Sequence, residues 1–222
     1  MANTDELFSK IPELVQRMQN EIANATVQPV PEGLLYEVVE NEIIQDEIVE
    51  GRTITITGYT GNAAILNIPN YINGLPVSSI VEEAFWGCES LTSITISSSV
   101  RSIGYYTFSD CSNLTSITVD NHNPVFASID GVLFDKNIRT LIRYPEGRNQ
   151  RTYVIPSSVT SIGEEAFSSC YSLTRVTIPS SVTTIGEGAF SGCTRLTSIT
   201  LSRNTQISEN AFPSSARITY RD

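Results

Sequence analysis

Apolar residues return along most of this chain at a fixed spacing of 23 positions. Within residues 155–213, Phe167 returns as Phe190, and Cys170 returns as Cys193. A fixed period of this length is typical of stacked repeats, because one such unit cannot bury its apolar face alone. The pattern therefore predicts a repeat solenoid.

Each unit contains a short stretch in which apolar and polar residues alternate. In the copy RVTI, which begins at Arg175, we expect Val176 and Ile178 to face inward. Consecutive strands should pair in parallel, which gives a right-handed α/β repeat solenoid. One parallel sheet would follow one face, and short helical turns with the AF pair would follow the other. The repeat phenylalanines should stack as an aromatic spine, formed by Phe85, Phe108, Phe167, Phe190 and Phe212.

One unit is longer than the others. Val119 and Ile155 are separated by 36 positions, which is 13 more than the period. The extra residues lie in IDGVLFDKNIRTLIRYPEG, where VLF and TLI flank the turn signal DKN. Two short strands around such a turn predict a β-hairpin near residues 129–145 that protrudes from the stack.

The ends of the solenoid depart from the regular unit. Residues 34–57 combine strand signals with an excess of acidic residues, which predicts an N-terminal β cap with turns at Asn41 and Gly51. Residues 203–222 hold a shortened copy without the cysteine, which predicts a C-terminal cap. The solenoid domain is therefore expected to cover residues 34–222.

Residues 1–33 precede the solenoid as a predicted helix and linker. Apolar residues at helical spacing indicate a helix over residues 4–25, with Thr4 and Asp5 as capping residues. Pro12 offers an alternative start. This helix would cover the open end of the solenoid, assemble a homo-oligomer or bind a partner, or form a mobile arm.

Three stretches resemble the BspA-like leucine-rich repeats, also called the Treponema pallidum type. They are TITGYTGNAAILNIPNYINGLPVSSI, IDGVLFDKNIRTLIRYPEG and IPSSVTSIGEEAFSSCYSLTRVTIP, and the resemblance covers residues 52–222. It implies a curved leucine-rich-repeat solenoid. The family is mostly bacterial and often surface-exposed, and it has members in adhesion and host contact. Its motif contains no catalytic residues, so the resemblance implies none here.

Charge is concentrated near the start of the chain. The net charge is -10, and residues 1–60 hold 11 Asp and Glu against 3 Lys and Arg. Nucleic acids and anionic membrane surfaces need a basic footprint, so neither is expected as a partner. No apolar run is long enough to insert into a membrane. The first residues lack a signal-peptide pattern, so we expect either a cytoplasmic protein or one whose leader has been removed.

Four cysteines occupy one repeat position, three residues after the repeat phenylalanine. They should therefore stack on successive turns as buried free thiols. Zinc thiolates come as close pairs with about two to four residues between them, and no such pair occurs. We expect neither a metal site nor disulfides. The cysteines are Cys88, Cys111, Cys170 and Cys193.

His122 is the only histidine, so a hydrolytic triad would need it. No GxSxG motif accompanies it, and a turn position is expected. Asp120 and Asn123 lack the spacing of an EF-hand calcium loop, and Asx turns explain them. GxxxxGK[ST] and GxGxxG are both absent, so no nucleotide or other cofactor is indicated.

Departures from the repeat are informative, because folding already explains the regular positions. Tyr105 and Tyr106 stand where another copy has two glutamates, and Trp86 stands where other copies have serine. We expect these three side chains to face solvent on one flank. Exposed aromatic groups of this kind either bind a partner or pack against the N-terminal helix or a loop. Tyr171 and Arg175 are secondary candidates for partner binding.

These observations favour a non-enzymatic repeat module that binds a protein or a glycan, in an adhesin-like role at the cell surface or in host interaction. The alternative is an intracellular scaffold that self-associates through residues 4–25. No catalytic, cofactor-binding or metal-binding residues are predicted.

Overall fold

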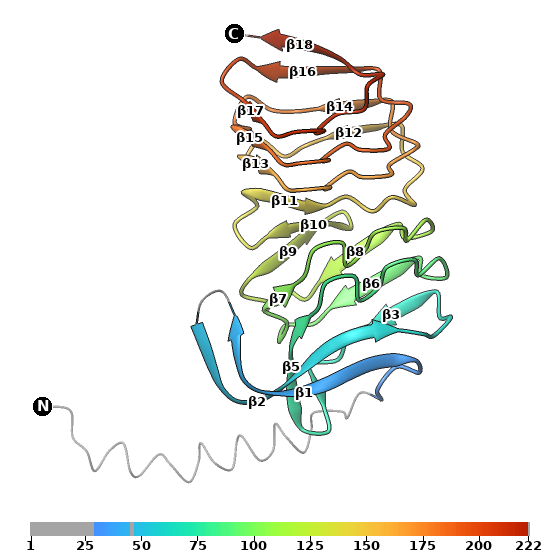
Figure 1. Ribbon diagram of the computed structural model, residues 1–222, viewed down its shortest axis with the longest axis vertical. Helices are drawn as coiled ribbons and strands as arrows, with labels where there is room; N and C mark the ends of the chain where they lie inside the picture. The colour runs from blue at the N-terminus through green and yellow to red at the C-terminus, as the bar shows by residue number, and fades with distance from the viewer. Residues whose placement is uncertain (1–28, 45–46, 222) are drawn as a thin grey trace, which may run out of the picture. The chain divides into compact units, whose positions relative to one another are not determined.

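A computed structural model describes residues 29–44 and 47–221. The chain divides into two units, Met1–Val30 and Pro31–Asp222, and the following description concerns the second. The helix expected over residues 4–25 lies outside the described residues. Figure 1 shows the coils of the second unit stacked on one another, from the blue strands to the red ones. The described elements are all β-strands.

The unit begins with a long antiparallel pair, β1 (Leu34–Ile44) and β2 (Glu47–Tyr59). Asn41 and Gly51 were expected to form turns, but both lie within these strands. They have positive φ angles of 52° and 103°, and the Gly51 amide donates to Asn41 Oδ1 at 3.2 Å. The register shifts here, so the two residues form a β-bulge and not a chain reversal.

β2 connects this hairpin to the repeats. It pairs in parallel with β5 (Leu75–Ile80), which in turn pairs with β4 (Tyr71–Ile72) and β7 (Ser102–Ile103). A separate parallel sheet contains β3 (Ile65–Asn67), β6 (Ser93–Ile96) and β8 (Ser116–Val119).

The later repeats build two further sheets. One is wholly parallel and contains β12 (Thr152–Val154), β14 (Arg175–Thr177), β16 (Ser198–Ser202) and β18 (Arg217–Arg221). The other contains β9 (Phe126–Ile129), β10 (Val132–Asp135), β11 (Thr140–Arg143), β13 (Ser161–Ile162), β15 (Thr184–Ile185) and β17 (Gln206–Ile207). The parallel solenoid is confirmed, but the described strands form four sheets, and not one along a single face.

The turns that carry the AF pair are not helical, and this part of the prediction is wrong. Residues two before and two after the repeat phenylalanine have positive φ, for example Glu83 at 58° and Gly87 at 68°. Alternate amides consequently point along the stack, and Phe85 N donates to Thr107 O of the next coil at 3.1 Å. In an α-helix φ is negative at every residue, and each amide donates to a carbonyl of the same helix. These turns instead bond one coil to the next.

The predicted aromatic spine is present in two segments. Phe85 and Phe108 stack with ring centroids 5.9 Å apart, and Phe167 stacks on Phe190 at 4.7 Å. Phe212 continues the second segment at 5.2 Å from Phe190. The buried apolar residues also form two clusters, and these meet at the long unit.

The long unit contains the predicted hairpin, but the hairpin does not protrude. β10 pairs with β9 and β11, and β11 continues the stack by pairing in parallel with β13. Val132, Leu133 and Phe134 are fully buried. Exposing three consecutive apolar side chains to water would cost free energy. The hairpin therefore packs into the stack, where it takes the place of part of a coil.

Cys111, Cys170 and Cys193 are buried, as predicted, whereas Cys88 is only partly buried. The Cys111 thiol donates to Phe85 O at 3.0 Å, and the Cys193 thiol donates to Phe167 O at 3.0 Å. Each thiol thus satisfies a backbone carbonyl of the preceding coil. Burial raises the pKa of the Cys111 thiol to about 12, so the thiol form is strongly favoured.

Candidate functional site

The long unit places an arginine where the other coils have a small residue. Tyr144 precedes Phe167 by one period and stacks on it at 5.2 Å, so Tyr144 occupies the phenylalanine position. Arg143 then occupies the position of the preceding alanine, and it is as buried as its counterparts. Those counterparts are Ala84, Thr107, Ala166, Ala189 and Ala211. A charge therefore lies in a column of small side chains.

Arg143 is held by backbone carbonyls on both sides of an interruption in the turn ladder. Its Nη1 donates to Glu165 O at 2.7 Å, and its Nη2 donates to Phe108 O at 3.2 Å. In a regular coil, the phenylalanine amide makes the connection to the next turn, as Phe167 N does to Ala189 O at 2.7 Å, and Tyr144 N still donates to Ala166 O at 2.7 Å. The interruption lies before Tyr144, between its coil and that of Phe108, and the bond from Arg143 Nη2 to Phe108 O spans it.

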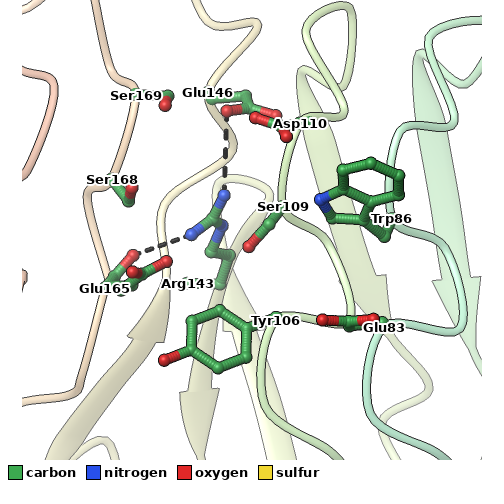
Figure 2. A pocket seen from close by; sticks show the side chains of 10 residues that line it. All are labelled: Glu83, Trp86, Tyr106, Ser109, Asp110, Arg143, Glu146, Glu165, Ser168 and Ser169. Carbon is green, nitrogen blue, oxygen red and sulfur yellow. Dashed lines mark hydrogen bonds and ion pairs between the residues drawn. The ribbon is translucent and has the colours of Figure 1, made fainter.

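Glu146 forms a buried pair with this arginine. Its Oε2 lies 3.8 Å from Arg143 Nη2, and the two side chains are 3% and 8% exposed. Figure 2 shows both groups together in the cleft. Three buried polar atoms in the described residues have no hydrogen-bond partner, and all three belong to this cleft: Ser109 Oγ, Arg143 Nε and Glu146 Oε1. Buried polar atoms are seldom left in this state unless a ligand or water completes them.

Burial also changes the acidity of the site. It raises the pKa of Glu146 to about 7, although the Arg143 charge opposes the shift. Burial likewise raises the pKa of Glu165, again against Arg143. The carboxyl of Glu146 therefore exchanges a proton near neutral pH.

The cleft has a volume of about 180 Å³. Trp86 is 59% exposed and Tyr106 is 38% exposed, and both line the cleft. Figure 2 shows the Trp86 indole across from Glu146 and Arg143. The cleft is lined by Glu83, Trp86, Tyr106, Ser109, Asp110, Arg143, Glu146, Glu165, Ser168 and Ser169.

A second cleft of about 340 Å³ adjoins the first. Tyr105, which is 68% exposed, lines this second cleft together with Tyr106. The two clefts share Tyr106, Ser109, Arg143 and Glu165. They therefore form one hollowed flank where the long unit interrupts the stack.

The structure separates the five candidate residues of the sequence into two groups. Trp86, Tyr105 and Tyr106 are exposed, as expected, and all three line the clefts. Tyr171 and Arg175 are exposed too, but neither lines either cleft.

The sequence analysis did not predict the buried polar residues of the cleft, Ser109, Arg143 and Glu146, which we call its polar floor. The 23-residue period could have placed Tyr144 in the spine and Arg143 in the small-residue column, but the sequence analysis assigned RYPEG to the protruding hairpin. Ser109 and Glu146 carried no signal of their own.

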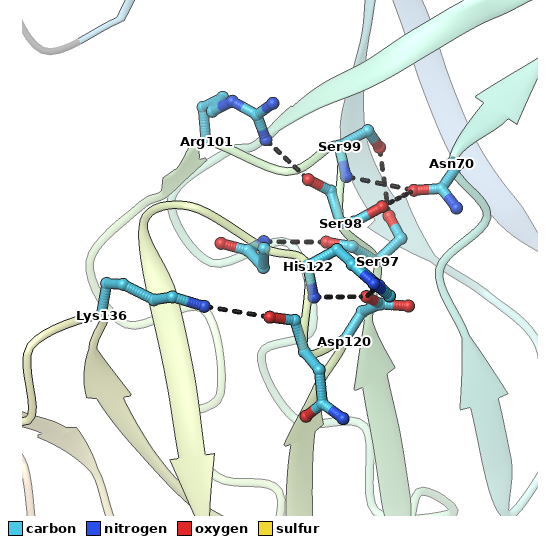
Figure 3. A network of polar contacts seen from close by, with 10 residues as sticks. Asn70, Ser97, Ser98, Ser99, Arg101, Asp120, His122 and Lys136 are labelled. Carbon is cyan, nitrogen blue, oxygen red and sulfur yellow. Dashed lines mark hydrogen bonds and ion pairs between the residues drawn. The ribbon is translucent and has the colours of Figure 1, made fainter.

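His122 lies elsewhere, in a polar network shown in Figure 3. Asp120 Oδ1 accepts the His122 backbone amide at 2.8 Å and lies 3.1 Å from its ring Nδ1. The buried Asn123 donates to Ser97 O and Val100 O and accepts two amides of the following residues. This is the turn role that the sequence predicted.

Within residues 29–44 and 47–221, no group of three or more His, Cys, Asp or Glu side chains is arranged to hold a metal ion. No segment with defined placement forms a helix with the length and hydropathy to span a bilayer.

Comparisons with known proteins agree with the repeat pattern. The model of the BspA type leucine-rich repeat region matches residues 63–141 and 144–221, with six copies. No curated protein matches the chain.

Among solved structures, a leucine-rich repeat protein from Bacteroides ovatus is 28% identical, with a TM-score of 0.53; the match covers 87% of this chain and 52% of that one. A Treponema pallidum leucine-rich repeat protein is 25% identical, with a TM-score of 0.40; the match covers 81% of this chain and 64% of that one. A leucine-rich cell surface protein from Faecalibacterium prausnitzii is 19% identical, with a TM-score of 0.43 and 87% of both chains covered. This chain thus spans less than two thirds of the first two proteins.

Proposed function

The chain belongs to the BspA-type leucine-rich repeat family, and we propose that it is a non-enzymatic module that binds a protein or a glycan through the hollowed flank at the long unit. Its role would be adhesin-like, at a bacterial surface or in contact with a host. One observation carries the proposal. The exposed aromatic residues that replace regular repeat residues line the same cleft as the buried polar atoms without partners.

The exposed aromatic residues support binding because their rings take no part in the aromatic spine. The repeat phenylalanines pack against one another in the spine. The side chains of Trp86, Tyr105 and Tyr106 are instead exposed to solvent. Tryptophan and tyrosine are the side chains that most often anchor ligands at interfaces. Their position beside a polar floor is typical of a specific binding site.

The chemistry of the cleft favours binding over catalysis. Ser109 has no hydrogen-bond partner, so no base activates its hydroxyl. Cys111 and Cys193 donate to backbone carbonyls within the core. His122 pairs with Asp120 outside the cleft.

The proposal is tested with an array of matrix proteins and glycans probed with the full chain. We expect at least one specific signal, and we expect Trp86→Ala with Tyr105→Ser and Tyr106→Ser to abolish it while the circular dichroism spectrum stays that of the wild type. Loss of the Tyr106 bond to Glu164 should lower the melting temperature only slightly. Tyr171→Ser is the matched control, because it removes an equally exposed aromatic ring outside the clefts. A signal that survives the triple variant, or one that Tyr171→Ser abolishes, would contradict the proposed site.

A further inference from the structure

The three unpartnered atoms of the cleft define what a ligand must offer. Arg143 Nε is a donor and needs an acceptor, while Glu146 Oε1 accepts and needs a donor when it is ionised. Ser109 Oγ can do either. The Arg143 and Glu146 side chains are 8% and 3% exposed, so their unpaired atoms lie at the bottom of the cleft, where the lack of a partner is costly.

Charged ligands satisfy only part of this set. An ammonium group donates to Glu146 but leaves Arg143 Nε without an acceptor. An anion accepts from Arg143 but meets four acidic residues around the cleft, against a single arginine. The acidic residues are Glu83, Asp110, Glu146 and Glu165. A neutral hydroxyl both accepts and donates, so adjacent hydroxyls can satisfy the whole set.

The volume of the cleft and the exposed Trp86 at its edge restrict the class of ligand further. The cleft volume is about 180 Å³, and a cavity of roughly 150 Å³ is enough to hold a single six-membered ring. Trp86 takes no part in the ring stacks of the described core and is 59% exposed. Its flat apolar face lies next to hydrogen-bonding groups. A sugar ring has the complementary character, with an apolar C–H face and a polar edge of hydroxyls.

We infer that the cleft binds one ring of a neutral saccharide, with its C–H face on Trp86 and adjacent hydroxyls on Arg143, Glu146 and Ser109. This inference rests on the proposed function and selects a glycan as the ligand. Arg143 Nε donates to one hydroxyl oxygen, and a hydroxyl donates to Glu146 Oε1. The clefts continue past Tyr106 to Tyr105, so a second sugar unit has room along the same flank.

The test uses ligand-observed NMR with the intact protein and a panel of methyl glycosides of neutral hexoses and N-acetylhexosamines. Sialic acid, glucosamine and the amide of N-acetylasparagine supply the anionic, cationic and amide comparisons. We expect a neutral glycoside to bind, and Trp86→Ala to abolish its binding. Binding only by the charged sugars or by the asparagine amide would overturn the inference.

Ser109→Ala is the most specific variant. The hydroxyl has no partner within the protein, so its removal should leave the melting temperature unchanged or higher. We expect it to weaken glycoside binding by at least about threefold, as the loss of one hydrogen bond implies. Ser191→Ala is the matched control, because Ser191 holds the same repeat position in an exposed place outside the cleft. Equal affinities of Ser109→Ala and Ser191→Ala would place the sugar elsewhere.

The two proposals can fail separately. If no neutral glycoside binds but the array signal is lost with the aromatic rim, the binding function stands and the saccharide inference is wrong. If the array is silent and a glycoside still binds the wild type but not Trp86→Ala, the saccharide inference stands, and its natural ligand was missing from the array.

Discussion

The phenol of Tyr106 donates a hydrogen bond of 3.0 Å to Glu164 Oε1, a residue 58 positions further along the chain. The bond crosses the hollowed flank at the point where ladder bonds are missing. Tyr106 stands in the repeat position that Glu165 holds in its own coil. A glutamate at residue 106 would add a further carboxylate to this flank, so the tyrosine converts a repulsive contact into an attractive one.

Replacing Glu164 should make Tyr106 more acidic. The hydrogen bond to Glu164 is the largest cause, and together with the charges of Glu164, Glu165 and Glu187 it raises the pKa of Tyr106 to about 12. In Glu164→Gln we expect the pKa of Tyr106 to move back toward 10, because the largest cause is removed. NMR of ring-labelled tyrosine measures this shift, with Tyr106→Phe to assign the signal. A Tyr106 signal that titrates alike in both proteins would contradict the bond.

Glu146 should make the folded state less stable as the pH rises. Its pKa is raised from 4.5 to about 7, so the folded protein binds this proton more tightly than the unfolded chain does. The contribution is fully present below pH 4.5 and is lost as the pH rises through about 7. The slope from this one group is at most about 1.4 kcal/mol per pH unit.

Glu146→Gln isolates that contribution. The amide does not titrate, so the free energy of unfolding of the variant relative to wild type should increase steadily as the pH rises from 5 to 7. Urea denaturation at several pH values measures the difference. Two parallel curves would show that Glu146 is not the titrating group.

The aromatic spine should dominate stability. Phe167 is fully buried between Tyr144 and Phe190, with ring centroids at 5.2 Å and 4.7 Å. Phe167→Ala is expected to reduce the free energy of unfolding by about 3–5 kcal/mol, because it leaves a cavity. Ser198→Ala, on the exposed side of β16, should change it by no more than about 0.5 kcal/mol. Denaturant titration of both variants checks the difference, and equal effects would mean that the two faces are reversed.

The four thiols should differ sharply in reactivity. Cys88 is partly exposed, whereas Cys111, Cys170 and Cys193 are buried. Burial raises the pKa of Cys88 and of Cys170, so little thiolate is available in either. In the native protein we expect a disulfide reagent to label Cys88 slowly and first.

The other three thiols should react only when the protein unfolds. Mass spectrometry of peptides over time distinguishes the sites, and urea supplies the fully labelled reference. Rapid labelling of two or more cysteines in the native protein would contradict the burial of Cys111, Cys170 and Cys193.

The sequence predicted the solenoid and its core well because one physical constraint repeats. Every coil must bury the same face, so Phe85, Cys111 and Ile178 could be placed from spacing alone. The parallel pairing of strands and the buried position of the thiols followed from the same regularity, and the structure confirms the pairing and the burial of Cys111, Cys170 and Cys193.

The turns were predicted wrongly because their conformation depends on backbone angles that few side chains reveal. Gly87, Gly188 and Gly192 have positive φ angles two residues from a phenylalanine, and they were the available signal. At the same positions other coils have Glu165 and Ser169, which adopt positive φ under the constraint of the stack. A composition with few glycines therefore concealed the pattern.

The polar floor of the cleft was missed because it depends on contacts between distant coils. Arg143 reaches Phe108 O, 35 positions away, and no local pattern announces such a bond. The rim was easier to find, since Trp86 and Tyr106 break the repeat at positions where the side chain points outward.

The missing ladder bonds also have a mechanical consequence. Between the coils of Phe167 and Phe190, three backbone bonds at 2.7–3.0 Å carry the load on this flank. At the cleft, the side chains of Arg143 and Tyr106 bridge the same flank. In a stack of coils, a pulling force is carried from one junction to the next. With fewer backbone bonds on this flank, we expect the flank to part there first under tension, which would open the proposed binding site.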